Sequence, residues 1–321
     1  MTVWTGDLKQ QLAEAVASSP LHASRAFMAV ISREDFAGVI PAASVERITS
    51  ELQLTLQDLM QECIPIARVY SVAPISNYHV GAVARGASGA LYFGFNMEFP
   101  GSTLAETVHG EQAAVTNAWT HGERRITDMA ISAAPCGHCR QFLHETAAGE
   151  DMQIHLPGGM GMSLKSLLPS AFGPKDLGIT AGLMANVPTS PFGKGVPSHS
   201  SMARRVAEQA LQEGYGPYSR CAAGIALQLT SGDIVAGWYA ENAAFNPTLE
   251  PLQSALISLR LLGSDPSDIA HCILVDAPGP LDHRFRTKEL LRLLAPKALL
   301  TAYHAQRSMR KSSPGETSLN G

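Results

Sequence analysis

The sequence predicts an α/β protein: a three-layer α/β/α domain with a mixed sheet, duplicated as a degenerate second copy and preceded by an N-terminal helical segment. Three observations support this prediction. Short apolar segments typical of strands alternate with helical segments. A weak internal repeat relates the two halves of the chain. The length of 321 residues exceeds the usual range of one domain and fits two domains of moderate size.

Residues 1–48 form the predicted N-terminal helical segment, which includes DLKQQLAEAVASS and SREDFAGVI. The next stretch, SVERITSELQLTLQDLMQEC, has apolar residues at spacings that partly fit a helical period. We expect this material to pack on the sheet that follows, in a structural role.

The first α/β domain is predicted over residues 49–180. YHVGAVARG and ALYFGFN are short and rich in β-branched and aromatic residues, and the Gly-Ala-Ser-Gly between them predicts a hairpin. Residues 126–134 and 152–156 are two further apolar segments of strand type. Two helical segments between these strands complete the layered pattern.

The second half follows a predicted linker at residues 181–198, where Pro, Gly and Ser recur. The second domain is predicted over residues 199–307 and a disordered tail over 308–321. SNYHVGAVA has a counterpart in GPYSRCAAGIA, FNME in WYAEN, and HGEQAAV in EPLQSAL. We therefore interpret the second domain as a degenerate copy of the first.

The segment from His109 to Cys139 has the residues of a metal site. His109 and Glu111 are separated by one residue, and Cys136 and Cys139 form a C-x-x-C pair after a proline. Three protein ligands leave a fourth zinc position for water, which is the arrangement of catalytic zinc. His109, Cys136 and Cys139 are therefore the predicted ligands, and Glu111 is the predicted catalytic base.

A C-x-x-C pair alone would also fit a redox pair or half of a four-cysteine metal site. Cys63, Cys221 and Cys272 are not paired at short spacing, which excludes the second alternative. A c-type haem motif needs a histidine where Arg140 stands. In the repeat, Glu250 replaces the histidine ligand, so the second copy has lost its metal site.

Helix geometry sets where the two helices begin. Residues i and i+2 do not share a face inside a helix, so we expect the first helix to start at about His109. Cys136 and Cys139 share a face, and a second helix beginning near Gly137 would favour both thiolates through its N-terminal dipole.

The H-x-E…P-C-x-x-C pattern makes the chain similar to the long, bacterial and plant type of cytidine deaminase. SNYHVGA (76–82), FNMEF (95–99), LLPSAFGPKDL (167–177) and ENAAFNPTLEPLQSAL (241–256) also match, so the resemblance covers most of the chain. It implies a homodimer with one zinc ion per chain that converts cytidine and deoxycytidine into uridine and deoxyuridine in pyrimidine salvage.

The resemblance also implies substrate contacts. Asn96 and Glu98 would bind the ribose, although alone they would fit the polar face of an edge strand. Tyr78 would flank the pyrimidine where the family commonly has Phe. Ala134, held extended before a proline, would direct its carbonyl to the substrate amine.

The resemblance also implies roles for two further residues, Gly110 and Phe245. Gly110 stands where the family commonly has Ala, and its backbone would contact the base with greater freedom before binding. Phe245 matches a residue that the second domain sends into the partner subunit's site, which implies a homodimer as the active form.

Composition narrows the class of protein. The formal net charge of −4 argues against a nucleic-acid partner, which would normally need a basic surface. No signal peptide or membrane-spanning segment is recognisable. Five cysteines, two of them assigned to metal, fit a reducing cytoplasm.

Two alternatives to cytidine deamination remain open. One is the deamination of another nucleobase or nucleoside, such as guanine. The other is a zinc-stabilised binding protein without catalysis, although a structural site would have no use for the Glu111 carboxylate.

Overall fold

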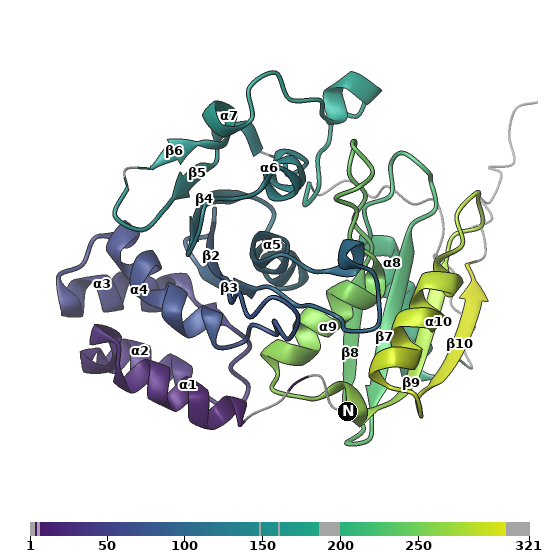
Figure 1. Ribbon diagram of the computed structural model, residues 1–321, viewed down its shortest axis with the longest axis horizontal. Coiled ribbons are helices and arrows are strands. Elements are labelled where there is room, and N and C mark those ends of the chain that lie inside the picture. The colour runs from purple at the N-terminus through teal and green to yellow at the C-terminus, as the bar shows by residue number, and fades with distance from the viewer. Residues whose placement is uncertain (1–3, 5–6, 148, 160, 186–199, 306–321) are drawn as a thin grey trace, which may run out of the picture.

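The computed structural model describes residue 4 and residues 7–147, 149–159, 161–185 and 200–305, which fold into two α/β domains (Figure 1). The first sheet has the order β1-β3-β2-β4-β5-β6, with strands β1 (Val39–Ile40), β2 (Gly81–Gly86), β3 (Leu91–Phe95), β4 (Ile126–Ile131), β5 (Gln153–His155) and β6 (Met162–Ser163). The second has the order β10-β9-β7-β8, with strands β7 (Ala223–Leu229), β8 (Ile234–Trp238), β9 (Ile269–Asp276) and β10 (Leu299–His304).

Both sheets are mixed in the same way. β4 and β5 run parallel in the first sheet, as β9 and β10 do in the second. The remaining strand pairs of the described residues are antiparallel. The predicted fold class, with a mixed sheet and a duplicated domain, is confirmed.

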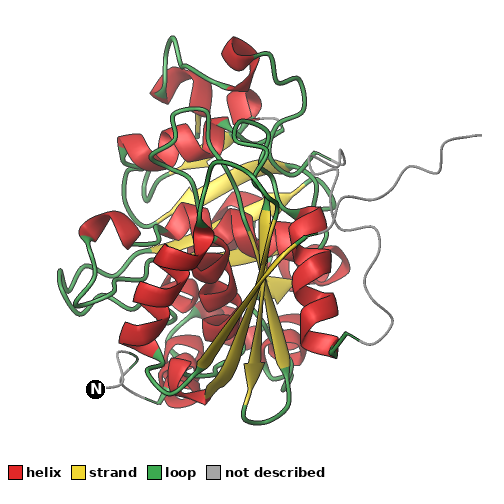
Figure 2. Cartoon of the chain, turned by 90° about the vertical axis from the view of Figure 1, so that its right-hand side faces the viewer, coloured by secondary structure: helices red, strands yellow, loops and turns green. Residues whose placement is uncertain are grey.

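Helices cover both faces of each sheet, as Figure 2 shows for the strands and the red helices beside them. The helices are α1 (Leu8–Ala17), α2 (Arg25–Ile31), α3 (Ala42–Leu52), α4 (Leu56–Arg68), α5 (Gly110–Thr120), α6 (Gly137–His144), α7 (Leu164–Leu167), α8 (Met202–Glu213), α9 (Pro251–Leu261) and α10 (His283–Leu294). In the first domain α4 packs on one face of the sheet and α5 on the other, and α8 and α9 take these places in the second domain.

Glycine allows α5 and α9 to approach their sheets closely. A Cβ atom on Gly94 in β3 would collide with the backbone of Ala114 in α5. Gly237 in β8 has the same relation to the backbone of Ala255 in α9. The two positions correspond in the repeat, so both domains use one packing solution.

The repeat extends to the turn before each central strand. Glu98 accepts hydrogen bonds from the Ser76 amide and hydroxyl, and Glu241 accepts the same pair of bonds from Ser219. The next residue, Asn77 or Arg220, has a positive φ of 55° or 60°. Two non-glycine residues in the left-handed region at matching positions indicate a shared turn geometry.

The predicted helix over SREDFAGVI is wrong, because residues 33–38 form turns and loop and β1 then pairs antiparallel with β3. Gly38 has a φ of +68°, and it packs against Phe93 in a space that admits no larger residue without a shift. The helical stretch after it is divided into α3 and α4, because Gln53 has a φ of 54° and Thr55 caps α4.

The predicted domain boundaries stay predictions. Residue 48 lies inside α3, and residues 181–185 of the predicted linker are described. There Leu183 exchanges backbone hydrogen bonds with Glu145 and Ala147. The rest of the linker, from residue 186, and residues 306–321 of the chain, with the predicted tail, lie outside the described residues.

The two domains share a core that includes side chains of both sheets. Trp119, at the end of α5, packs edge to face against Trp238 of β8, with ring centroids 4.9 Å apart.

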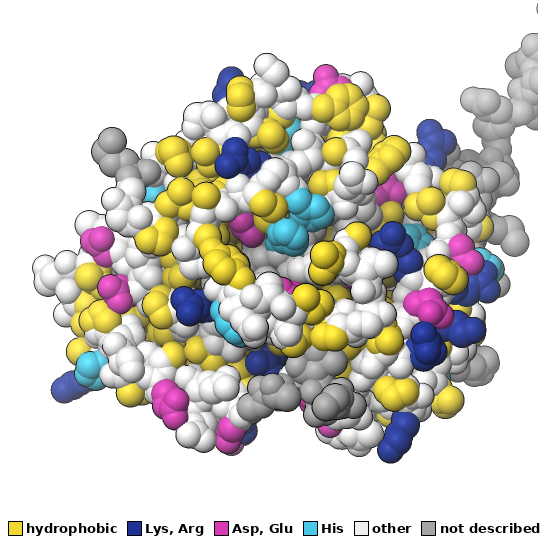
Figure 3. All heavy atoms as spheres, viewed as in Figure 1, with side chains coloured by type: hydrophobic (Ala, Val, Ile, Leu, Met, Phe, Trp, Pro, Cys, Tyr) yellow, Lys and Arg dark blue, Asp and Glu magenta, His cyan; other side chains and the backbone are white. Residues whose placement is uncertain are grey.

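On the surface shown in Figure 3, Lys and Arg side chains are interspersed with Asp and Glu. Within the described residues, no helix combines the length and apolar character needed to cross a membrane.

Candidate metal centre

The first turn of α5 carries two of the predicted functional residues. His109 is the N-cap of α5 with extended backbone, and Glu111 is buried in the first turn. Gln112 stabilises this end of the helix, because its Oε1 accepts a hydrogen bond from the His109 amide at 3.1 Å. The expected helix start at His109 is confirmed.

The N-terminus of α6 brings two sulfurs to His109. Cys136 is the N-cap of α6 and Cys139 lies in its first turn, with their Sγ atoms 3.6 Å apart. The Nδ1 atom of His109 lies 3.5 Å from Cys136 Sγ and 3.3 Å from Cys139 Sγ. Tetrahedral zinc with usual bond lengths requires about 3.8 Å between two sulfurs and about 3.6 Å between sulfur and nitrogen. The donor set therefore fits zinc in chemistry and geometry.

The environment of Cys136 favours the deprotonated state that a metal needs. The hydrogen-bond contact between the two sulfurs lowers the pKa of Cys136 to about 4. The same hydrogen bond, together with burial, raises the pKa of Cys139. Zinc takes both sulfurs as thiolates, so proton release accompanies metal binding.

Burial raises the pKa of Glu111, against the smaller opposing effect of a hydrogen bond to Cys139. A carboxyl group whose pKa moves toward neutrality can both accept and return a proton, which general acid/base catalysis requires.

His138 lies next to the ligands although the sequence did not single it out. Its ring stacks on His109 with centroids 4.7 Å apart and an interplanar angle of 21°. Burial lowers the pKa of His138, so the ring stays neutral beside the metal ligands. Its buried Nε2 has no hydrogen-bond partner among the described residues.

Gly110 is explained by its surroundings. A Cβ atom at this position would lie 2.9 Å from Cγ1 of Val80, which is closer than real Cβ contacts allow. The glycine therefore avoids a shift of Val80 or of the first turn of α5.

Asn96 and Glu98 lie just beyond the end of β3 and both contact the loop of residues 71–80. The Oδ1 of Asn96 accepts from Ser71 and from the Val80 amide, and its Nδ2 donates to the Tyr78 carbonyl at 2.9 Å. The Glu98 carboxylate accepts three hydrogen bonds from the same loop. Tyr78 itself is 59% exposed, so its ring is free to meet a ligand.

The remaining predicted contacts are on the surface. Ala134 is exposed in the segment between β4 and α6, directly before Pro135. Phe245 is 67% exposed and has a φ of 64°, which is unusual for a bulky residue. Its ring lies 6.5 Å from that of Tyr218, measured between centroids.

In the second domain an ion pair occupies the corresponding place. Glu250 stands at the N-cap of α9, and its Oε2 lies 3.1 Å from Nδ1 of the buried His283. Nε2 of His283 lies 2.8 Å from the Cys221 carbonyl oxygen. Cys272 is a buried residue of β9, as expected. Clusters of three or more His, Cys, Asp or Glu side chains could hold a metal. Among the described residues, His109, Cys136 and Cys139 form the only such cluster.

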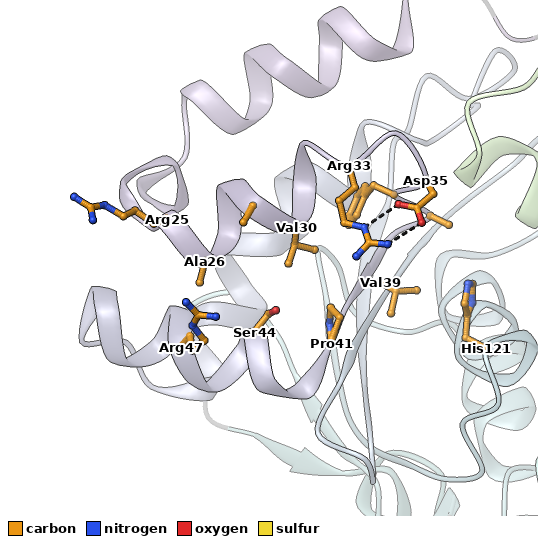
Figure 4. Close-up of a pocket in the computed structure, with 13 residues that line it drawn as sticks. Arg25, Ala26, Val30, Arg33, Asp35, Val39, Pro41, Ser44, Arg47 and His121 are labelled. Atoms are coloured by element: carbon orange, nitrogen blue, oxygen red, sulfur yellow. Dashed lines mark hydrogen bonds and ion pairs between the residues drawn. The ribbon is translucent and has the colours of Figure 1, made fainter.

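A separate cavity of about 580 Å³ lies between α2 and α3 (Figure 4). Arg25, Arg33 and Arg47 contribute to its lining, and the guanidinium of Arg33 is paired with Asp35. None of the predicted site residues lines this cavity.

Two mixed-sheet domains and one three-ligand centre with an adjacent buried glutamate define a zinc-binding α/β protein of the deaminase class. Two family models, both described as the cytidine and deoxycytidylate deaminase zinc-binding region, match residues 54–153 and 164–288. The chain belongs to this family, and its cofactor is zinc.

Relatives of similar length extend the match. The cytidine deaminase of Vibrio parahaemolyticus is 40% identical over 90% of this chain and 97% of its own length. The cytidine deaminases of Aliivibrio fischeri and Proteus mirabilis are 41% and 42% identical, over 91% and 87% of this chain and 97% and 90% of their own lengths.

Proposed function

We propose that this protein is a hydrolase that deaminates cytidine and deoxycytidine, giving uridine or deoxyuridine and ammonia. The observation that carries the proposal is the buried Glu111 in the first turn of α5, two residues after His109 of the three-residue metal cluster. The relatives named cytidine deaminase, which this chain matches almost end to end, support the choice of substrate.

His109, Cys136 and Cys139 would hold the zinc ion. When bound, zinc supplies Lewis acidity that lowers the pKa of a water molecule at its open position. Glu111 takes one proton from the attacking water and passes it to N3 of the base, and it then takes the proton of the new C4 hydroxyl group and passes it to the departing amine. The C4–N bond breaks, a C4–O bond forms, and ammonia leaves.

Asn96 and Glu98 would bind the ribose hydroxyls, with Tyr78 against the base. A carboxylate has about four acceptor positions, and Glu98 uses three of them for the loop of residues 71–80. Asn96 keeps one amide hydrogen beyond its contact to the Tyr78 carbonyl. The Gly110 backbone and the Ala134 carbonyl would then contact the base and its amine.

The active form would be a homodimer in which Phe245 reaches the partner's site. Phe245 and Phe172 are exposed aromatic residues, and both belong to segments bonded to Gln141: its side chain donates to the Phe172 carbonyl, and its carbonyl accepts from the side chain of Asn242, in the loop of Phe245. Large exposed apolar side chains brought together in this way are typical of an interface.

The proposed role is in pyrimidine salvage in the cytoplasm. All five cysteines are free thiols, and the zinc centre itself needs reduced sulfur. A small nucleoside, rather than a nucleic acid, remains the proposed substrate of a chain with a net charge of −4.

The loss of cytidine absorbance in the ultraviolet, measured with zinc counted per chain, tests the proposal. We expect turnover of cytidine and deoxycytidine with one zinc ion per chain. Turnover of guanine or adenosine alone would show that the substrate is another nucleobase or nucleoside. Full zinc without turnover of any of the four would indicate a binding protein.

A further inference from the structure

A loop of the second domain, residues 241–248, is held by the helix that carries the two cysteines. The side-chain amide of Asn242 donates to the carbonyl of Gln141 in α6 at 3.0 Å. The amide of Ala243 donates to Oε2 of Glu145, the C-cap of α6, at 2.9 Å. Both contacts are made within one chain and cross from one domain to the other.

The same loop is also held by the helix of the histidine ligand. Gln112 in α5 donates from Nε2 to the carbonyl of Pro247 at 3.1 Å, while its Oε1 accepts from the His109 amide. The loop that presents Phe245 therefore rests on both helices of the metal centre.

Glu145 is the least expected member of this contact. Its side chain is 0% exposed, and the ion pairs of the described residues do not include it. Besides the Ala243 amide, it accepts hydrogen bonds from the hydroxyls of Tyr215 at 2.7 Å and Tyr218 at 2.5 Å. Burial and the adjacent Glu145 carboxylate raise the pKa of both tyrosines, so both hydroxyls remain donors.

Burying the Glu145 carboxylate costs free energy that packing alone would not require. A buried carboxylate without a cation depends on complete hydrogen bonding, and an apolar side chain of similar volume would need no partners. Two of the three side-chain partners of Glu145 lie beside Phe245: the loop itself and Tyr218, whose ring is near that of Phe245. The third, Tyr215, packs edge to face against Tyr218.

We propose that Glu145 is a positioning residue that fixes the 241–248 loop, and with it Phe245, to the helix of the cysteine ligands. The inference rests on the proposed contact of Phe245 with the nucleoside. In the proposed dimer, Glu145 of one chain would thereby shape the pocket of the other, so that each metal centre supports its neighbour's substrate binding.

The test compares Glu145→Gln, Glu145→Leu and the control Glu123→Gln in the zinc-loaded, full-length protein. Glu123 is also a buried carboxylate that holds a turn, through the amide and hydroxyl of Ser88, but its hydrogen-bond partners belong to the first domain and not to this loop. The measurements are zinc per chain, amide hydrogen exchange of residues 241–248, and KM and kcat for cytidine.

We expect Glu145→Leu to keep its zinc, to exchange faster at residues 241–248, and to raise KM about tenfold with kcat within about threefold. Glu145→Gln keeps an acceptor oxygen and should lie between this variant and the wild type. Glu123→Gln should match the wild type in all of these measurements. If Glu145→Leu does not fold, Tyr218→Phe removes one of the three hydrogen bonds and should show the same direction of change.

Unchanged exchange at residues 241–248 in Glu145→Leu would overturn the inference, as would faster exchange without a rise in KM. A protein that does not deaminate cytidine would refute the proposed function, and hydrogen exchange would still show whether Glu145 holds the loop.

Discussion

At the scale of single residues, the metal centre is assembled by two helix N-termini that meet. His109 and Cys136 are both N-caps, and Cys139 and Glu111 lie in the first turns behind them. Positive helix ends favour thiolate and carboxylate charge. Because the ligands already lie at distances suited to tetrahedral zinc, metal binding needs deprotonation rather than rearrangement.

Replacing one sulfur should therefore abolish metal binding. We expect Cys136→Ala to lose both zinc and deaminase activity, since metal affinity depends on the thiolates. Cys272→Ala, which removes a buried thiol of β9, is the matched control and should keep one zinc per chain. Metal analysis by mass spectrometry checks both, and full zinc in Cys136→Ala would reject the ligand set.

Glu111→Gln separates metal binding from proton transfer. Glutamine fills the same space but cannot shuttle protons, so zinc content should stay unchanged while kcat falls. A positioned acid or base contributes ~10²–10⁴-fold, and the several transfers assigned to Glu111 place the loss at the upper end or beyond. A kcat within about tenfold of wild type would show that another group performs this role.

At the scale of elements, the two domains use the same pair of helix starts differently. In the first domain the starts of α5 and α6 carry the metal ligands, and in the second the starts of α9 and α10 are joined by the pair of Glu250 and His283. Burial by itself lowers the pKa of His283, but the hydrogen bond and charge of Glu250 outweigh it, so the pKa is raised. The Cys221 carbonyl and Asp276 act in the same direction, and the ring of Tyr239 packs edge to face against His283.

The stability of the second domain should depend on this pair and on pH. A histidine with a raised pKa in the folded state contributes stability that is fully present below the unfolded pKa of about 6.5 and is lost as the pH rises through the folded value. Glu250→Gln should thus lower the free energy of unfolding more at about pH 6 than at about pH 8.5.

Urea unfolding of both proteins at the two pH values measures this difference. The zinc centre is the same in both, so its own pH dependence cancels. Glu289→Gln, which removes an exposed pair with Arg292, is the control and should cost little at either pH. An equal loss at both pH values would mean that His283 is not charged by Glu250.

Elements with strong local signals were predictable, and elements decided by distant contacts were not. The hairpin of β2 and β3 and the starts of α5 and α6 follow from turn residues and from the spacing of the ligands. The segment at residues 32–40 has helical composition, but pairing of β1 with β3 outweighs it.

The same limit applies within the site. His109, Glu111 and the two cysteines were recognisable because each pair is fixed by one turn of helix. Gln112 could have been found as the third residue after the N-cap. Its bond to Pro247, 135 residues away, and the role of Glu145 depend on how the domains pack, which no local pattern encodes.

At the scale of the whole molecule, each domain sends a loop to the other. Gln112 of the first domain holds the Pro247 carbonyl, and the equivalent Gln253 of the second holds the Glu106 carbonyl at 2.7 Å. Glu106 also pairs with Arg286 of α10. In the described residues of the second domain, Glu250 takes the place of a metal ligand, and the domain remains part of the structure that surrounds the metal centre of the first.

A mixing experiment tests whether Phe245 acts across a dimer interface. Glu111→Gln and Phe245→Ala should each be poorly active at low cytidine, the first through kcat and the second through KM. If Phe245 serves the partner's site, each heterodimer regains one intact site, made from the Glu111 of one chain and the Phe245 of the other. An equal mixture after subunit exchange should then recover about one quarter of the wild-type sites.

The matched control mixes Glu111→Gln with Cys136→Ala. Each of these changes inactivates the metal centre of the chain that carries it. Here every heterodimer site carries one lesion, so no activity should return, and any gain would point to an effect of mixing itself. If Phe245 acts within its own chain, the first mixture will behave like this control. Recovery in the first mixture and not in the second would locate Phe245 in the neighbour's pocket, because only an exchange of chains can bring the two intact residues together.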